Sequence, residues 1–327
     1  MLVSDIKKTI NQMGDREAMG LPMHNVDTRV PNLSNALLHV KKYNKHELVE
    51  TAESHQLFEY RYAAGILLGL LGDPRTLTIT PKMIEIPSGE IEIGIDINQA
   101  YEVFDRFNQL GVQQEWILKE VPKFTVMVKA FKVSKYLVTN ENYYDFLLDT
   151  KYCELPSSWE FGIYPHLKSN HPVYSISDDA AIAYTKWLSQ KTGRFFRLPT
   201  EYEWEYAASG PAHYEYPWGG EYKPDLCNTL ETGLYSSTPV GIFPKGNSPF
   251  GVSDMSGNVE EYVQDYYHPY PNGAVIVDDL GNIDEYRIAR GGSFTRHHDL
   301  ARTTRRHGRF SRDIYVMGFR LAEDKYN

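Results

Sequence analysis

The chain has 327 residues, and 42% of them are hydrophobic, so it can bury a sizeable core without disulfides or metals. The net charge of −9 disfavours nonspecific binding to nucleic acid, and no apolar run approaches the roughly 20 residues that span a bilayer. Residues 1–17 lack the apolar core of a signal peptide and only two cysteines are present, so we expect a cytoplasmic protein without a disulfide framework or membrane contact.

Residues 1–80 are predicted to form a helical segment of their own. Charged and apolar residues alternate at helical spacing over residues 40–71, and the Gly72-Asp73-Pro74 sequence is typical of a helix end. The pattern resembles a single HEAT-type repeat. One such repeat cannot bury its own apolar face, so we expect it to pack on residues 81–327 or on a protein partner.

Short strands and isolated helices are predicted from residue 81 onward. Residues 83–94 read as a hairpin around a Pro-Ser-Gly turn, residues 96–120 as a partly helical insertion, and residues 124–133 as a strand. Helices are expected over 140–148, over 178–192 and after Thr200, where Glu203 completes a capping box. Nearly 100 residues after Gly210 show no long pattern, which is usual for functional loops or for loops that bound calcium holds in place.

Positive charge is concentrated near the C-terminus. The stretch from Arg287 to Arg312 contains eight Arg and one Asp, a local balance of +7 in an otherwise acidic chain. A cluster that contains arginines but no lysine is typical of two arrangements. The planar guanidinium groups either recognise anions or form buried ion pairs. We expect an anion-binding surface from five of them: Arg296, Arg305, Arg306, Arg309 and Arg312.

A series of short segments in order carries a family resemblance. They lie at 86–90, 134–140, 171–173, 197–208, 216–219, 238–241, 250–259, 290–293 and 318–321, and include Arg-Leu-Pro-Thr-Glu-Tyr-Glu-Trp, Ser-Gly-Asn-Val, Arg-Gly-Gly-Ser and Gly-Phe-Arg-Leu. Residues 81–327 thereby resemble the formylglycine-generating enzyme (sulfatase-modifying factor) family. The resemblance implies an α+β, C-type-lectin-like fold with little regular secondary structure, preceded by the helical segment, and internal ion pairs for Arg290, Arg302 and Arg320.

The segment from Asp254 to Glu261 offers the carboxylates of Asp254 and Glu261 and several turn carbonyls within eight residues. Hard oxygen ligands at this spacing suit Ca²⁺, although a solvated acidic turn would look the same. The resemblance implies structural calcium, with a first site and a second, smaller one. The implied ligands are Asp254, Gly257, Val259 and Glu261 for the first site, and Asn228 and Glu231 for the second.

The reactive segment of the family is altered in this chain. In the formylglycine-generating enzymes two cysteines follow Gly-Gly-Ser by three and eight residues and bind Cu(I), whereas Arg296 and Ala301 stand there in this sequence. We therefore do not expect formylglycine synthesis by that mechanism. Ser293 and His297 match what the family keeps, and Glu260 replaces an aromatic residue of the family's groove.

Three histidines lie within eleven residues of the same segment. His297, His298 and His307, with Asp299, include the ligand types of a two-His-one-carboxylate Fe²⁺ site, but each could equally be an ordinary hydrogen-bonded histidine. Adjacent strand residues point to opposite faces, so at most one of His297 and His298 should face the groove. We assign catalysis to Ser293, His297 and His307. The expected substrate contacts are Glu260, Arg296, His298, Asp299 and Arg305.

Three functional hypotheses follow. The first is an oxidoreductase-like, metal-dependent family member with altered metal chemistry, acting on a peptide or an anionic small molecule. The second is a non-catalytic, calcium-braced, lectin-like module that binds a protein or an anionic ligand. The third is a scaffold that engages a protein partner through the N-terminal helices. Fold alone does not choose among them.

Overall fold

The structure is a computed structural model that describes residues 8–277, 286–309 and 312–324. Its helices and strands are mixed along the chain, which confirms the predicted α+β class. No helix in these ranges is long and apolar enough to cross a membrane.

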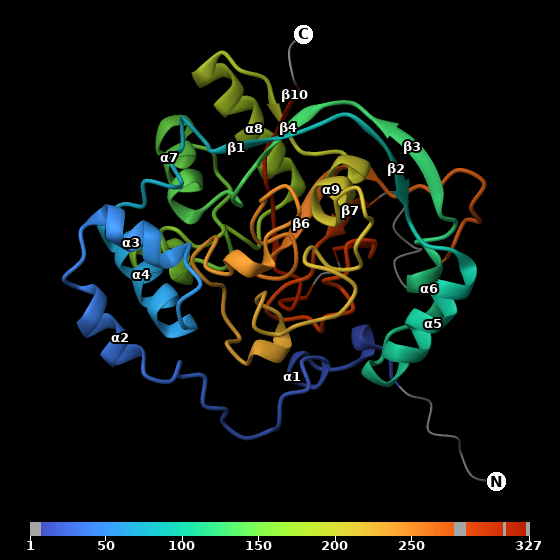
Figure 1. Ribbon diagram of the computed structural model, residues 1–327, viewed down its shortest axis with the longest axis horizontal. Helices are drawn as coiled ribbons and strands as arrows, with labels where there is room; N and C mark the ends of the chain where they lie inside the picture. The colour runs from blue at the N-terminus through green and yellow to red at the C-terminus, as the bar shows by residue number, and fades with distance from the viewer. Residues whose placement is uncertain (1–7, 278–285, 310–311, 325–327) are drawn as a thin grey trace.

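The N-terminal helices form one flank of the molecule, coloured blue in Figure 1. After the short α1 (Asp15–Ala18) come α2 (Leu33–Val40), α3 (Lys45–Ala52) and α4 (Phe58–Leu71), and Gly72 ends α4 with a φ of 81°. Buried alanines and leucines of α2–α4 pack with Ile242 and Phe243, and Arg61 Nη1 donates to the Ile242 carbonyl at 2.7 Å. The apolar face of the helical segment is therefore covered by the rest of the chain.

The predicted hairpin at 83–94 is wrong in its pairing, although both strands exist. β1 (Met83–Ile86) pairs with β4 (Phe131–Ser134), while β2 (Gly89–Ile93) pairs with β3 (Phe124–Val128). The Pro-Ser turn directs β1 and β2 into different sheets instead of folding them onto each other, and the predicted strand at 124–133 is divided in the same way. The two bent ribbons arch together over the top of the molecule in Figure 1.

Two four-stranded sheets contain β1, β4 and the strands that have not yet been described. The first has the order β1-β4-β10-β5, in which β10 (Ala322–Asp324) lies between β4 and β5 (Phe196–Arg197). The second has the order β8-β7-β6-β9 and contains β6 (Glu260–Tyr266), β7 (Arg287–Arg290), β8 (His307–Gly308) and β9 (Met317–Gly318). Since β6 and β9 are parallel neighbours, the start of β6 lies next to the chain that follows the arginine-rich segment.

The helices outside the N-terminal flank follow their local signals. They are α5 (Ile97–Phe107) and α6 (Gln114–Leu118) in the predicted insertion, α7 (Asn140–Thr150), α8 (Asp178–Thr192) and α9 (Glu201–Ser209). Thr200 and Glu203 form the predicted capping box of α9, and Gly193, with a φ of 68°, ends α8. These predictions are confirmed because capping and termination depend on neighbouring residues.

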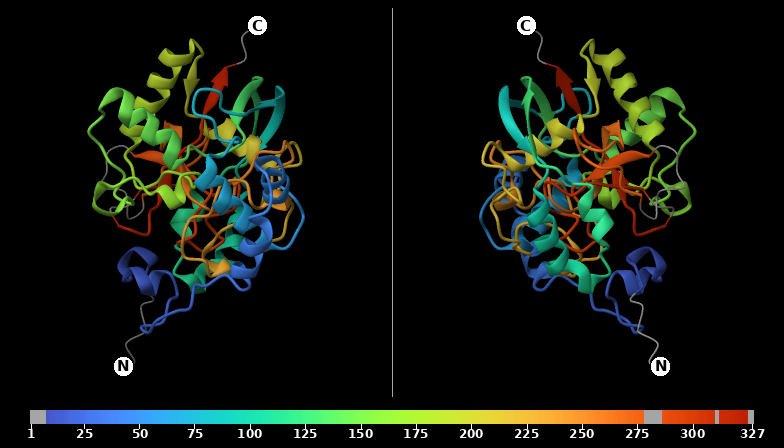
Figure 2. Two further views of the ribbon diagram at one scale, coloured as in Figure 1. Left: turned by 90° about the vertical axis from the view of Figure 1, so that its left-hand side faces the viewer. Right: turned by 90° about the vertical axis from the view of Figure 1, so that its right-hand side faces the viewer.

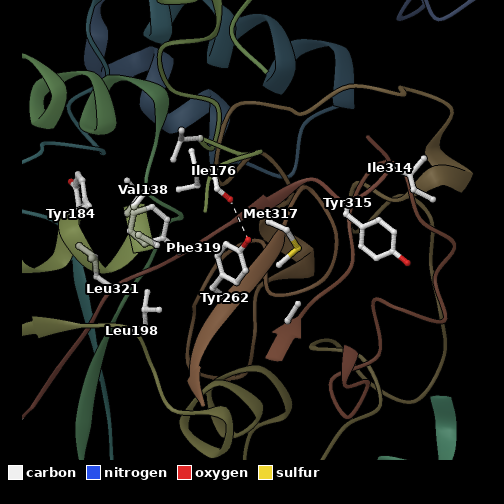
Figure 3. Close-up of a cluster of buried hydrophobic side chains, with 14 of the residues drawn as sticks. Val138, Ile176, Tyr184, Leu198, Tyr262, Ile314, Tyr315, Met317, Phe319 and Leu321 are labelled. Carbon is white, nitrogen blue, oxygen red and sulfur yellow. Dashed lines mark hydrogen bonds between the residues drawn. The ribbon is translucent and has the colours of Figure 1, made fainter. Parts of the chain in front are cut away.

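The main core lies between α8 and the second sheet. Tyr262 of β6, Met317 of β9 and Phe319 converge there, and the Tyr262 hydroxyl donates to the Ile176 carbonyl at 3.2 Å (Figure 3). Tyr315 belongs to the same cluster but lies at its edge, beside the arginine-rich loop. The core thus fixes both ends of that loop through β7 and β9.

Candidate functional site

The loop that links β7 to β8 contains most of the predicted catalytic and substrate-contact residues. Gly291 and Gly292 open it with φ values of 92° and 65°, and a Cβ on Gly292 would meet the backbone of Leu300 and Ala301 at 2.9 Å. Only glycine fits this turn, because other residues rarely adopt such φ values and the neighbouring backbone cannot move away. Ser293 follows it and is fully buried.

Several arginines of this region are paired with buried glutamates. Arg302 donates to both carboxylate oxygens of Glu120 at 2.6 and 2.8 Å, and Arg320 does the same with Glu261 at 2.5 and 2.8 Å. Arg290 pairs with Glu205. The internal pairing implied for Arg290, Arg302 and Arg320 is therefore confirmed.

The expected anion-binding surface is wrong for several of its arginines. Arg306 is buried and binds Glu201 through Nε and Nη2 at 2.7 and 2.9 Å, and Arg312 is paired with Asp15 at 2.7 Å. Arg296 and Arg305 are also buried, whereas Arg309 is exposed. Glu201 and Asp15, which bind Arg306 and Arg312, come from distant segments, and no local feature of the sequence marked them as partners.

Five residues instead form what we call the polar chamber: Glu260, Arg296, Asp299, Arg305 and His307. Each is at least nine-tenths buried. Each also has one polar side-chain atom without a hydrogen-bond partner, namely Glu260 Oε2, Arg296 Nη1, Asp299 Oδ1, Arg305 Nε and His307 Nε2. Such atoms are rare in folded proteins, so five in one place indicate a site for water or a ligand.

Two acid–base pairs of side chains in the chamber lie close together, but at distances too long for hydrogen bonds. His307 Nε2 lies 3.7 Å from Glu260 Oε2, and Arg305 Nε lies 3.8 Å from Asp299 Oδ2. The Ser293 hydroxyl donates to Glu260 Oε1 at 3.2 Å. A cavity of about 20 Å³ is lined by Arg296, Arg305 and His307 among others, which is enough for about one water molecule.

Burial perturbs the protonation of this group. It raises the pKa of Glu260 to about 7, although the nearby Arg296 guanidinium acts in the opposite direction. Burial, with the charges of Arg296 and Arg305, lowers the pKa of His307 well below its usual range. Near neutral pH Glu260 can therefore carry a proton beside a neutral His307, an arrangement suited to proton transfer.

The three predicted histidines are not brought together. His297 and His298 both point at Glu231, whose Oε1 lies 3.3 Å and 2.7 Å from their Nδ1 atoms, while His307 lies in the chamber. His297 and His298 lie in a loop and not in a strand, so the alternation of strand faces, which would let at most one of them face the groove, does not apply. Within the described ranges, no group of three or more His, Cys, Asp or Glu is arranged to hold a metal ion.

The calcium ligands implied for the first site do share one turn. Asp254 Oδ2 accepts from the Gly241 backbone at 2.8 Å, and burial raises the pKa of Asp254 to about 6. Arg320, however, binds both oxygens of Glu261 and also donates to the Asp254 carbonyl at 3.3 Å. A guanidinium therefore already provides positive charge in this turn.

The ligands implied for the second calcium site diverge. Asn228 lies beside Gly257 and donates to the Ser236 carbonyl at 2.9 Å, whereas Glu231 is engaged by the two histidines. Tyr222 stacks on His298 with ring centroids 4.0 Å apart, beside Glu231. Sequence spacing did not reveal this separation.

Known proteins share the fold and much of the sequence. The family described as "Sulfatase-modifying factor enzyme 1-like domain" matches residues 71–325. The chain is similar to the formylglycine-generating enzyme of Mus musculus, at 26% identity over 286 residues, covering 70% of each chain. It is also 30% identical over 241 residues to the hercynine oxygenase of Mycobacterium tuberculosis, covering 63% of this chain and 55% of that one. The solved structure of PvdO from Pseudomonas aeruginosa aligns at a TM-score of 0.58 and 25% identity, covering 77% of this chain and 97% of that one.

Proposed function

Because the chain belongs to the family of sulfatase-modifying factor enzyme 1-like domains, we propose that it acts on a small anionic molecule through the polar chamber. The chamber lies on the segment that begins with Gly-Gly-Ser. Arg296 and Ala301 stand at the two positions where the formylglycine-generating enzymes have cysteines, and both are buried. A copper–thiolate centre at these positions is therefore not part of the proposal.

The observation that carries the proposal is the group of five buried polar atoms without partners. An unpaired buried polar group costs about 1–3 kcal/mol. Three of the five residues, Arg296, Arg305 and His307, line the cavity of about 20 Å³, so an occupant there that pairs with them is favoured. Arg296 and Arg305 supply guanidinium donors, and paired guanidiniums suit a carboxylate or phosphate group. The class of ligand that fits these two arginines is a small anion.

Each chamber residue has a distinct role in this proposal. Arg296 and Arg305 bind and orient the anionic group. Glu260 holds a proton near neutral pH, and His307, 3.7 Å away, stays neutral beside it. Ser293 keeps Glu260 in place through the hydrogen bond to Oε1.

The oxidoreductase hypothesis requires a redox metal in addition. His297, His298 and Glu231 supply nitrogen and oxygen donors of the type that binds Fe²⁺, yet their donor atoms contact each other, and the described part of the chain has no preformed group of three ligands. The fit is poor, so we derive no step through a metal. Metal analysis of the purified protein tests this point, since stoichiometric iron or copper would restore the redox hypothesis.

The second candidate is a non-catalytic binding module. It rests on the same arginines as the first candidate, because the cavity of about 20 Å³ has to open before any ligand enters. In this case the chain would bind its anion and release it unchanged. The two candidates share the ligand class and differ in turnover.

Binding and turnover can be measured separately. We expect formate and acetate to raise the melting temperature of the wild type, and Arg296→Gln and Arg305→Gln to lose that effect. Arg309→Gln is the matched control, because Arg309 lies on the same segment but is exposed. If Arg309→Gln abolishes the effect as fully as the chamber variants, or if no anion stabilises the wild type, the proposal is wrong. If every bound anion is recovered chemically unchanged, the second candidate, the non-catalytic binding module, is the function.

A further inference from the structure

We propose that residues 9–20, here called the N-terminal arm, form a displaceable lid over the polar chamber. The inference rests on the proposed function, because it concerns access to the same site. The arm contains a single 3-10 turn (Ile10–Gln12) and α1, and it lies apart from α2–α4, as the dark blue segment in Figure 2 shows. The long connection to α2 has no helix or strand from residue 21 to residue 32.

The arm supplies one wall of the chamber cavity. Asn11 lines that cavity, and the other lining residues come from two stretches, 116–119 and 296–315. The Tyr315 hydroxyl donates to Asn11 Oδ1 at 2.5 Å, while the Arg296 guanidinium lies 4.5 Å above the ring of the same tyrosine. Tyr315 therefore connects the arm directly to an arginine of the chamber.

Polar contacts at the surface hold the arm down. Arg312 donates to the Ile10 carbonyl at 2.7 Å and to Asp15 Oδ1 at 2.7 and 3.1 Å. The side chains of Arg312 and Asp15 are 15% and 47% exposed. Ion pairs of this exposure contribute little net stability, because water competes for both partners. Such contacts can open at little cost in stability.

The apolar anchor of the arm consists of four side chains. Ile10 and Ala18 belong to the main core cluster, and the partly buried Met13 and Met19 pack against it. Ile10 and Ala18 are buried, and all other residues of the arm are half-buried or exposed. The far end of the arm reaches the other part of the reactive loop, since a Cβ on Gly20 would lie 4.0 Å from His297 Cε1. The arm thus crosses the loop from Tyr315 to His297 with few buried contacts.

A cavity of about 20 Å³ holds about one water molecule, so an anion such as formate cannot occupy it while the arm stays in place. Binding must then be coupled to release of the arm. Molecules in which the arm is closed do not bind the anion, so they lower the apparent affinity for it. Any change that loosens the arm should raise this affinity.

The test uses the full chain, with sodium formate as the probe and sodium chloride at equal ionic strength as the reference. We expect Arg312→Gln and Asp15→Asn, which remove the same ion pair from its two sides, to lower the apparent Kd for formate about tenfold. Arg29→Gln is the matched control, because the Arg29–Asp27 pair is exposed and lies in the connection to α2. Asp15→Asn also guards against misfolding of the other variant, since Asp15 is exposed.

Hydrogen exchange gives an independent readout. Saturating formate should speed amide exchange in residues 9–20 of the wild type while residues 33–71 stay unchanged. If formate binds the wild type and both variants with equal apparent affinity, and exchange in the arm does not change, the lid is wrong and the proposed function stands. If formate binds to none of the proteins, loosened variants included, the proposed function fails and the lid with it.

Discussion

Glu260 and His307 face each other across 3.7 Å inside the polar chamber, and neither Glu260 Oε2 nor His307 Nε2 has a hydrogen-bond partner. Both groups are buried, and the charge of the nearby Arg296 guanidinium acts to lower the pKa of each. The pair is therefore sensitive to pH and to substitution.

Replacing Glu260 should change how stability depends on pH. Burial raises the pKa of Glu260 from its usual 4.5 to about 7, so the folded protein binds more protons than the unfolded chain between these values. The stability associated with protonated Glu260 is complete below about pH 4 and is lost as pH rises through 7, by at most about 3 kcal/mol. Glu260→Gln should remove this loss.

Urea unfolding between pH 4 and pH 8 measures the effect. The expected result is a variant that gains stability relative to the wild type as pH rises. Glu90→Gln, at an exposed position, is the control and should follow the wild type at every pH. Parallel curves for Glu260→Gln and the wild type would show that Glu260 titrates normally.

The buried pair of Glu120 and Arg302 should be essential for stability. Glu120 accepts hydrogen bonds from Arg302 and from Thr304, and no water reaches it. Glu120→Gln leaves the Arg302 charge buried without its counter-ion, which typically costs about 3–5 kcal/mol. Urea unfolding should show this loss, whereas Arg29→Gln at an exposed ion pair should stay within about 1 kcal/mol of the wild type. Equal effects of the two variants would contradict the assignment.

The protein should not convert a cysteine to formylglycine with Cu(I). The reason is the replacement of both thiol ligands by Arg296 and Ala301, while the free cysteines are Cys153 at the surface and Cys227 in the interior. Mass spectrometry of a cysteine-containing sulfatase-type peptide, with and without copper, should show no loss of the expected mass. A copper-loaded formylglycine-generating enzyme on the same peptide is the positive control, and copper-dependent product from this chain would refute the prediction.

Calcium stays a prediction from the sequence. Ca²⁺ bound at Asp254 should raise the free energy of unfolding by about 2.7 kcal/mol at a hundredfold excess over Kd. Chelator should then lower the melting temperature of the wild type but not that of Asp254→Ala. An unchanged melting curve, with no calcium in the purified protein, would mean that the Arg320 guanidinium meets the need for positive charge in this turn by itself.

Helix limits and family membership could be predicted because their signals are local. Thr200 with Glu203 marks the start of α9, and Gly193 marks the end of α8, through contacts between residues at most a few positions apart. The pairing of β1 and β2 could not be predicted, because alternation indicates a strand but not its neighbour. Both strands of the expected hairpin found other partners, β4 and β3.

The sequence by itself determined the family, the α+β class and the loss of the two thiol positions, which depend on residue identity at fixed spacing. Only the tertiary structure decided the fate of the arginines, since Arg302 meets Glu120 from 182 positions away. The same holds for the arm, where Tyr315 reaches Asn11 across 304 positions. Burial and ion pairing arise from contacts between distant segments, and no local pattern records which segments will meet.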